Sequence, residues 1–239
     1  MISKAEIKRI RALHLKKQRD ESGLFVVEGE KMVAEALSSG FEVESVYRIE
    51  DIGEEAMARI SLLSSPSPAL AVVRIPAVPA KDDIDALIAS RPLCLALDGV
   101  RDPGNLGTIV RIADWFGIDA IFASPDTVEL YNPKTVQATM GAIFRRKVIY
   151  CDLPHIARRF TEAGMPVWGT FLDGEDIYGA SLTPEGLIVM GSESNGIGPR
   201  MEALVSRRLF IPPYPRDDAG SESLNVAIAT AITCAFFRK

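Results

Sequence analysis

The chain has 239 residues, of which 47% are hydrophobic and 25% are charged, and its formal net charge at pH 7 is −5. This length is enough for one large or two modest domains with a buried core, and the composition is that of an ordinary globular protein. The acidic balance argues against a general nucleic-acid-binding surface, so any such surface must be local.

Cysteine usage and hydropathy narrow the class further. Cys94, Cys151 and Cys234 are far apart in the sequence and lie in apolar surroundings, which predicts reduced core residues rather than a disulfide framework or a zinc site. The longest mainly apolar run, residues 224–237, is too short to span a membrane, and the N-terminal segment lacks the apolar core of a signal peptide. We therefore expect a cytoplasmic protein with no membrane-spanning segment.

The most basic part of the chain comes first. Residues 1–20 carry seven Lys or Arg side chains against Glu6 and Asp20, a local charge of about +5. A helix that begins near Ser3 would place several of these cations on one face. That face is either solvated or a contact for nucleic-acid phosphates, and the two interpretations stay open at this point.

Short strands and helices alternate over the next segment, up to residue 75. The predicted strands are residues 24–27, 43–49 and 70–74, and the predicted helices are residues 31–37 and 54–63. This alternation predicts a small α/β domain over residues 1–75. Residues 76–91 are rich in proline and alanine and are predicted to be a linker, with a short helix over residues 82–89.

From residue 92 onward the alternation continues in what we expect to be a second domain, residues 92–239. The predicted strands are residues 92–97, 119–123, 147–150, 167–171, 187–190 and 209–211. The predicted helices are residues 106–116, 131–141, 153–163 and 224–237. Strands that alternate with helices imply a mostly parallel sheet with both faces covered.

The most informative stretch is residues 97–117, LDGVRDPGNLGTIVRIADWFG. An apolar run ends at Asp98, a turn-rich segment follows, and apolar residues then recur at helical spacing. A strand–loop–helix unit of this kind is the commonest place for an α/β sheet to hold a ligand. Arg111 is on an exposed position of the helix, on the turn after Asn105, and suits an anionic or phosphorylated substrate.

A second glycine-rich stretch is residues 187–198, LIVMGSESNGIG, in which glycines frame Glu193. It is not a nucleotide-binding P-loop, because Ile197 and Gly198 stand where that motif requires Lys and Ser or Thr. The turn around Asn105 likewise lacks the G-x-G-x-x-G pattern of dinucleotide-binding folds. Taken alone, the stretch is either a flexible turn or a ligand-binding loop.

Three stretches, in this order, resemble the motifs of the SpoU (TrmH) family of RNA ribose 2′-O-methyltransferases, within the SPOUT superfamily. The pattern N-x-G-x-x-x-R from Asn105 to Arg111 resembles the first motif, and residues 187–198 resemble the second. Residues 211–227, IPPYPRDDAGSESLNVA, resemble the third. Residues 23–29, after the basic helix, resemble the L30e-like substrate-binding domain often fused to this family.

The resemblance implies an α/β protein with a small L30e-like RNA substrate-binding domain followed by a mostly parallel SPOUT methyltransferase domain. In that family the second domain contains a trefoil knot, an expectation that rests on the resemblance alone. The implied cofactor is S-adenosylmethionine, the implied partner is rRNA or tRNA, and no metal is implied. A homodimer packed through the knotted domain is also implied, and Trp115, Phe116 and the final helix offer apolar surface for it.

The resemblance also assigns roles to individual residues. Backbone groups of Gly191, Ile211 and Leu224 would hold the adenosine of the cofactor, and Thr170 would be a further cofactor contact. The residues expected to form the catalytic site are Asn105, Arg111, Glu193 and Asn225. In an RNA enzyme, the local positive charge of the N-terminal segment favours phosphate contacts, so we expect Lys8, Arg11, Lys16 and Lys17 to bind RNA.

Methyl transfer from a sulfonium requires the ribose oxygen to lie in line with the methyl group, about 3 Å away. A guanidinium stays protonated in proteins, so we expect Arg111 to stabilise the developing alkoxide or to bind the adjacent phosphate. The proton would leave to phosphate, to Glu193 or to water. Glu193 could equally organise its own loop, and Asn225 could simply cap the final helix.

Two departures from the family pattern concern the choice of substrate. Residues 213–220 form a longer and more acidic loop than usual, and Ala227 replaces a common serine. His14 and His155 lie outside the motifs, so neither histidine catalysis nor a histidine metal site is expected. The sequence thus predicts an RNA 2′-O-ribose methyltransferase, and the alternative is a non-catalytic RNA-binding or ribosome-assembly protein with the same fold.

Overall fold

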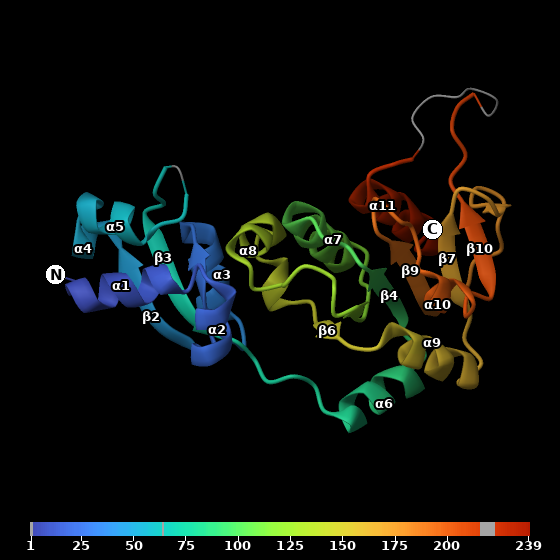
Figure 1. The fold of residues 1–239 in the computed structure, drawn as a ribbon, viewed down its shortest axis with the longest axis horizontal. Helices are drawn as coiled ribbons and strands as arrows, with labels where there is room; N and C mark the ends of the chain where they lie inside the picture. The colour runs from blue at the N-terminus through green and yellow to red at the C-terminus, as the bar shows by residue number, and fades with distance from the viewer. Residues whose placement is uncertain (1, 64, 216–222) are drawn as a thin grey trace. The chain divides into compact units, whose positions relative to one another are not determined.

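The structure of the protein is a computed structural model that describes residues 2–63, 65–215 and 223–239 (Figure 1). The chain divides into two compact units. The first consists of Met1–Ala77 together with Glu129–Arg145, and the second of Val78–Val128 together with Arg146–Lys239. The chain therefore passes from one unit to the other three times, after residues 77, 128 and 145.

The first unit is a small α/β unit, as the sequence predicts. Its elements are α1 (Lys4–Ala12), α2 (Lys16–Ser22), β1 (Leu24–Glu28), α3 (Glu30–Ser38), β2 (Val43–Arg48), α4 (Ile49–Ile52), α5 (Glu54–Ile60), β3 (Ala69–Arg74), α8 (Pro133–Thr139) and the 3-10 helix η1 (Ala142–Phe144). Strand β3 lies between β1 and β2 and is antiparallel to both. Every residue of β1 is buried, as its continuous apolar run indicates, and Ile7 and Ile10 of α1 pack in the same core.

Residues 129–145 belong to the compact first unit, although they lie within the range predicted for the second domain. Their first residue, Glu129, forms an ion pair with Arg19, whose side chain is almost completely buried (N–O distance 2.6 Å). The Tyr131 ring packs on Phe25, with ring centroids 4.8 Å apart. These contacts join segments about a hundred residues apart, which local sequence patterns do not reveal. The functional boundaries at residues 75 and 92 stay a prediction.

The second unit contains the predicted alternation of strands and helices. Its elements are α6 (Lys81–Ala89), β4 (Leu93–Asp98), α7 (Pro103–Trp115), β5 (Ile121–Ala123), β6 (Val148–Tyr150), α9 (Leu153–Glu162), β7 (Val167–Phe171), β8 (Glu175–Asp176), β9 (Gly186–Gly191), α10 (Pro199–Glu202), β10 (Arg207–Phe210) and α11 (Val226–Phe237). Within the described residues these strands form a seven-stranded sheet in the order β6-β5-β4-β9-β7-β10-β8, and each pair is parallel. The prediction of a mostly parallel α/β sheet is therefore confirmed.

Helices cover both faces of this sheet (Figure 1). Helices α7 and α11 pack against each other, and the Trp168 ring of β7 meets Phe237 of α11 at 5.4 Å between centroids. Helix α9 packs with α10, and its residues share an apolar core with the alternate residues of β4 and β9. Because both faces are covered, β4 and β9 are buried along almost their whole length.

The cysteines are free thiols, as predicted. Burial raises the pKa of Cys94 and of Cys234 to about 12 and that of Cys151 to about 11, so all three are protonated at neutral pH. Over the described part of the chain, no helix is long and apolar enough to cross a membrane. The same residues contain no cluster of His, Cys, Asp and Glu placed to hold a metal ion.

The trefoil knot stays a prediction. Residues 216–222, which link β10 to α11 and form the middle of the third motif, lie outside the described residues. Most of the acidic loop noted at residues 213–220 falls in the same segment.

Candidate functional site

The three motifs converge where the central strands of the sheet end. Strands β4 and β9 are neighbours in register, and their last residues, Asp98 and Gly191, lie opposite each other. From β4 the chain continues to β5 on one side, whereas from β9 it continues to β10 on the other. A parallel sheet opens a crevice at such a reversal of strand order, next to the carboxyl ends of the strands.

Asn105 is positioned by the first turn of α7. The Asp102 side chain caps this helix by accepting the N–H of Asn105 at 2.8 Å, and Pro103 occupies the first helical position. The Asn105 side-chain amide then bonds in two directions. Its Nδ2 donates to Oε1 of Glu193, and its Oδ1 accepts from Nδ2 of Asn225 at 3.0 Å. One amide thus joins all three motifs.

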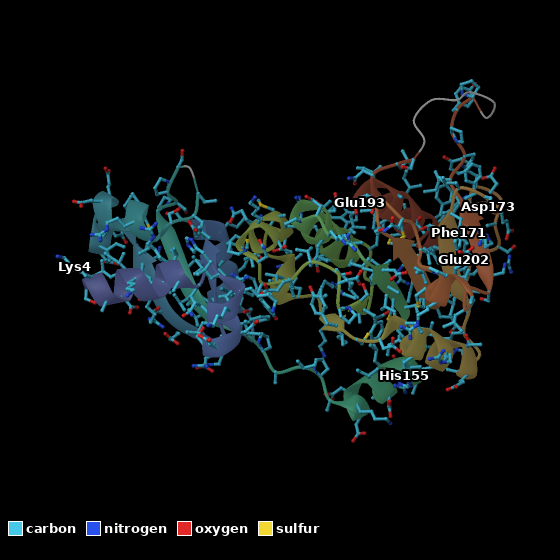
Figure 2. All side chains as sticks on the ribbon, in the orientation of Figure 1. Lys4, His155, Phe171, Asp173, Glu193 and Glu202 are labelled. Atoms are coloured by element: carbon cyan, nitrogen blue, oxygen red, sulfur yellow. The ribbon has the colours of Figure 1, made fainter. Side chains whose placement is uncertain are left out.

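Glu193 is on an exposed loop that begins directly after β9 (labelled in Figure 2). The loop closes on itself through two backbone hydrogen bonds of 3.0 Å between Ser192 and Gly196. The Ser192 hydroxyl also accepts the N–H of Asn195 at 3.1 Å. Backbone groups and the Ser192 hydroxyl therefore organise the loop, and the carboxylate of Glu193 accepts a hydrogen bond from Asn105. This arrangement argues against the interpretation of Glu193 as the organiser of its own loop.

Asn225 precedes α11 and combines the two roles considered for it. Its Oδ1 accepts the N–H groups of Ala227 and Ile228 at 2.9 and 3.3 Å, which is N-terminal capping of α11. At the same time its Nδ2 donates to Asn105. Capping fixes the orientation of the Asn225 amide, so the contact with Asn105 has a defined geometry.

Arg111 is exposed on α7, about 1.7 helical turns beyond Asn105. None of the described residues provides a hydrogen-bond or ion-pair partner for its guanidinium. Most other arginines of this unit pair with a carboxylate, for example Arg146 with Asp114 at 2.9 Å. A solvated, unpaired guanidinium on the helix that also carries Asn105 is suited to bind an anionic group from outside the protein.

Three of the four residues expected to hold the cofactor, Thr170, Gly191 and Ile211, are also brought together by the sheet. Thr170 on β7 lies opposite Leu209 of β10, and its hydroxyl donates to the carbonyl of Val189 on β9 at 3.2 Å. Ile211 directly follows β10, and Gly191 ends β9, so three adjacent strands present these residues at the same edge. Leu224 is half exposed and precedes Asn225. The roles of these residues stay a prediction.

Two residues of this region were not found by sequence reasoning. Asp98 accepts the N–H of Gly198, at the end of the Glu193 loop, at 2.7 Å. Arg208 on β10 donates to Asp173 at 2.5 Å and to Glu202 at 2.7 Å. Its guanidinium carbon also lies 3.5 Å from the ring centre of Phe171. Figure 2 labels Asp173, Glu202 and Phe171. Both residues fix segments that border the strand ends. The contacts of Asp98 with Gly198 and of Arg208 with Asp173 join residues 100 and 35 positions apart, so no local pattern signals them.

The four basic residues expected to bind RNA are all exposed in the first unit. They differ in their surroundings. Lys16 and Lys17 form ion pairs one helical turn apart with Asp20 and Glu21, at 2.7 and 3.8 Å. Lys8 and Arg11 on α1 have no carboxylate partner within the described residues.

Comparison with known proteins identifies both units. Residues 92–235 match the model of the SpoU rRNA Methylase family, and residues 4–71 match that of the MRM3-like substrate binding domain. The 23S rRNA (guanosine(2553)-2′-O)-methyltransferase RlmP of Bacillus subtilis (strain 168) is 30% identical over 243 residues. That alignment covers 95% of this chain and 93% of the relative.

Solved structures agree with this assignment. A protein of the TrmH family of RNA methyltransferases from Porphyromonas gingivalis has a TM-score of 0.85 and 36% identity, and the match covers 100% of this chain and 98% of the other. An AdoMet-bound rRNA methyltransferase from Sinorhizobium meliloti has a TM-score of 0.84 and 28% identity, with 100% and 96% covered.

The fold, the polar site at the strand ends and the substrate domain together define the class, an RNA methyltransferase that uses S-adenosylmethionine. The chain belongs to the SpoU rRNA methylase family. The predicted enzyme class and cofactor are thereby confirmed.

Gly191 offers a test of the predicted cofactor site. A Cβ atom at this position would lie 2.1 Å from the carbonyl carbon of Gly196 and 2.3 Å from the nitrogen of Ile197, so the loop would have to move. We expect Gly191→Ala to weaken binding of S-adenosylhomocysteine about tenfold or more in calorimetry. Gly179→Ala is the control, because nothing lies within 4 Å of its Cβ position. Unchanged affinity for S-adenosylhomocysteine in Gly191→Ala would show that this loop is not part of the cofactor site.

Proposed function

We propose that this protein methylates the 2′-hydroxyl of one ribose in large-subunit ribosomal RNA and acts in the cytoplasm. The observation that carries the proposal is the hydrogen-bonded set Asn105, Glu193 and Asn225, which joins three separate motifs. The unpaired Arg111 is on the same helix as Asn105. A non-catalytic RNA-binding protein would not need this complete polar set. The similarity to a 23S rRNA methyltransferase over nearly the whole chain supports the choice of rRNA.

The residues at the strand ends fit the cofactor that the family uses. S-adenosylmethionine supplies an electrophilic methyl group when bound. Backbone groups of Gly191 and Ile211 and the partly buried Thr170 offer neutral donors and acceptors suited to an adenosine. The bare Cα of Gly191 lets the chain of residues 196 and 197 approach closely, which fixes loop shape without adding charge.

Arg111 is assigned to the RNA side of the site. Its guanidinium stays protonated, so it acts by charge: it binds the phosphate next to the target ribose, or it stabilises the oxygen as negative charge develops there. Glu193 is assigned as proton acceptor. One of its carboxylate oxygens is held by the Asn105 amide, which leaves the other for the ribose hydroxyl.

Residues 1–75 are assigned as the RNA-binding module and residues 92–239 as the catalytic module. In the first module, α1 offers the unpaired cations Lys8 and Arg11. Lys16 and Lys17 would add to this surface by exchanging their carboxylate partners for phosphates.

We also propose that the protein acts as a homodimer. Trp115 at the end of α7 is 85% exposed, and Ile228 near the start of α11 is 53% exposed, so neither side chain fills the core of its own subunit. These two helices pack against each other and present both residues to solvent.

We expect light scattering at micromolar concentration to give a dimer mass for the parental protein. The double variant Trp115→Glu with Ile228→Glu should give a monomer mass. A parental protein of monomer mass would reject the proposal.

Replacement of Arg111 tests the catalytic assignment. We expect Arg111→Ala to lower kcat by about 10²- to 10³-fold, as loss of one charge-stabilising donor does, and to leave S-adenosylhomocysteine affinity within about threefold. Arg158→Ala, an exposed arginine on α9, is the matched control and should keep full activity. A large loss of cofactor binding in Arg111→Ala would contradict its assignment to the RNA side.

The substrate is tested by mass-spectrometric mapping of ribose methylation in rRNA from a strain that lacks the protein.

The basic residues are tested by the salt dependence of RNA binding. Each phosphate contact contributes roughly 0.7 to 0.9 to the slope of log K against log salt. Replacement of Lys8, Arg11, Lys16 and Lys17 by Gln should flatten this slope by several units and leave cofactor binding unchanged. The pair Lys8 and Arg11 should account for more of the change than Lys16 and Lys17, whose charges are already partly neutralised. A parental slope in the quadruple variant would show that this face is merely solvated.

A further inference from the structure

The Glu193 loop is held at its exit by a residue of another strand. Asp98 is the last residue of β4 and lies opposite Gly191, where the loop begins. Its Oδ2 accepts the N–H of Gly198, where the loop ends, at 2.7 Å. The backbone at Asp98 thus meets the start of the loop, and its side chain holds the end. A carboxylate bond to a backbone N–H is among the stronger hydrogen bonds of proteins.

The other contacts of the loop differ in what they fix. The bonds between Ser192 and Gly196 are internal to the loop. The hydrogen bond from Asn105 to Glu193 joins exposed groups. Because these groups can form hydrogen bonds to water instead, this bond adds little net free energy. Ile197, next to Gly198, is buried in the apolar core and holds the end of the loop by packing, which is not directional. Among these hydrogen bonds, the partly buried bond of Asp98 is the one that ties the backbone of the loop to a strand of the sheet.

The backbone that carries Asp98 is itself restrained from the opposite side. The buried hydroxyl of Ser124 accepts the N–H of Gly99 at 2.9 Å. The buried hydroxyl of Thr127 donates to the carbonyl of Leu97 at 3.1 Å. With both neighbours of Asp98 fixed, its carboxylate is a rigid point of attachment for the loop.

We propose that Asp98 is a positioning residue for methyl transfer: it holds the exit of the Glu193 loop so that Glu193 stays in contact with Asn105. The inference rests on the proposed function of Glu193 as proton acceptor. Asp98 does not touch the reacting atoms in this assignment and acts through the loop. Its loss should therefore lower kcat and leave the KM for RNA unchanged.

A matched control lies at the other end of the same strand. Asp119 accepts the N–H of Leu93, the first residue of β4, at 2.9 Å. Asp98→Ala and Asp119→Ala each remove one carboxylate bond to a backbone N–H, that of Gly198 and that of Leu93. We expect similar shifts in melting temperature, but a loss of kcat of about 10- to 100-fold in Asp98→Ala alone, since small displacements at a site have effects of this size. Asp98→Asn should retain kcat within about threefold, because its amide oxygen accepts the same N–H.

A double-mutant cycle separates positioning from simple destabilisation. In a Glu193→Gln background, Asp98→Ala should have little further effect on kcat, because the group that it positions has already lost its function. Full additivity of the two losses, equal kcat in the two alanine variants, or failure of Asn to restore kcat would each overturn the proposal. If Glu193→Gln alone keeps parental kcat, the proposed function of Glu193 fails instead, and the two failures are told apart.

Discussion

The site depends on one side-chain amide, that of Asn105. An asparagine amide carries both donors and an acceptor in one plane, so it can join a carboxylate on one side to a donor on the other. Here it links Glu193 of the second motif to Asn225 of the third, 88 and 120 residues away in the sequence. A carboxylate at this position would repel Glu193, and an aliphatic side chain would leave both partners unpaired. The presence of Asn in the first motif thus has a direct physical reason.

The direction of these hydrogen bonds is set by the start of α11. The N–H groups of Ala227 and Ile228 require an acceptor, so Asn225 turns its oxygen toward them and its NH₂ toward Asn105. Asn105 must then accept with its oxygen and donate with its NH₂, which meets Glu193. Donors therefore point from the first turn of α11, through the amides of Asn225 and Asn105, toward the carboxylate of Glu193. Helix α11 thus supports the site through its first turn as well as through its apolar face.

The sequence predicted what depends on local pattern. Apolar runs predicted the strands of the parallel sheet, and glycine-rich turns predicted the strand-to-helix turn before Asn105 and the loop that carries Glu193. It could not predict contacts between distant segments, such as the bond of Asp98 to Gly198 or the burial of Arg19 against Glu129. A count of charged residues also does not show which side chains form ion pairs, because pairing depends on the three-dimensional neighbours of each side chain. Whether the chain forms a knot depends on its path in space, which residue pattern does not encode.

Ion pairs of the N-terminal cations bear on how a protein with a negative net charge binds RNA. Of the seven cations in residues 1–20, Arg19 is buried against Glu129, and Arg9 binds Glu6 and Glu44. Lys16 and Lys17 are paired with neighbours on α2. Lys4, Lys8 and Arg11, spaced by four and three residues along one face of α1, are left without carboxylate partners in the described residues. An RNA backbone that meets this narrow row displaces few existing ion pairs, so a short cationic face can bind phosphate even though the chain as a whole is negative.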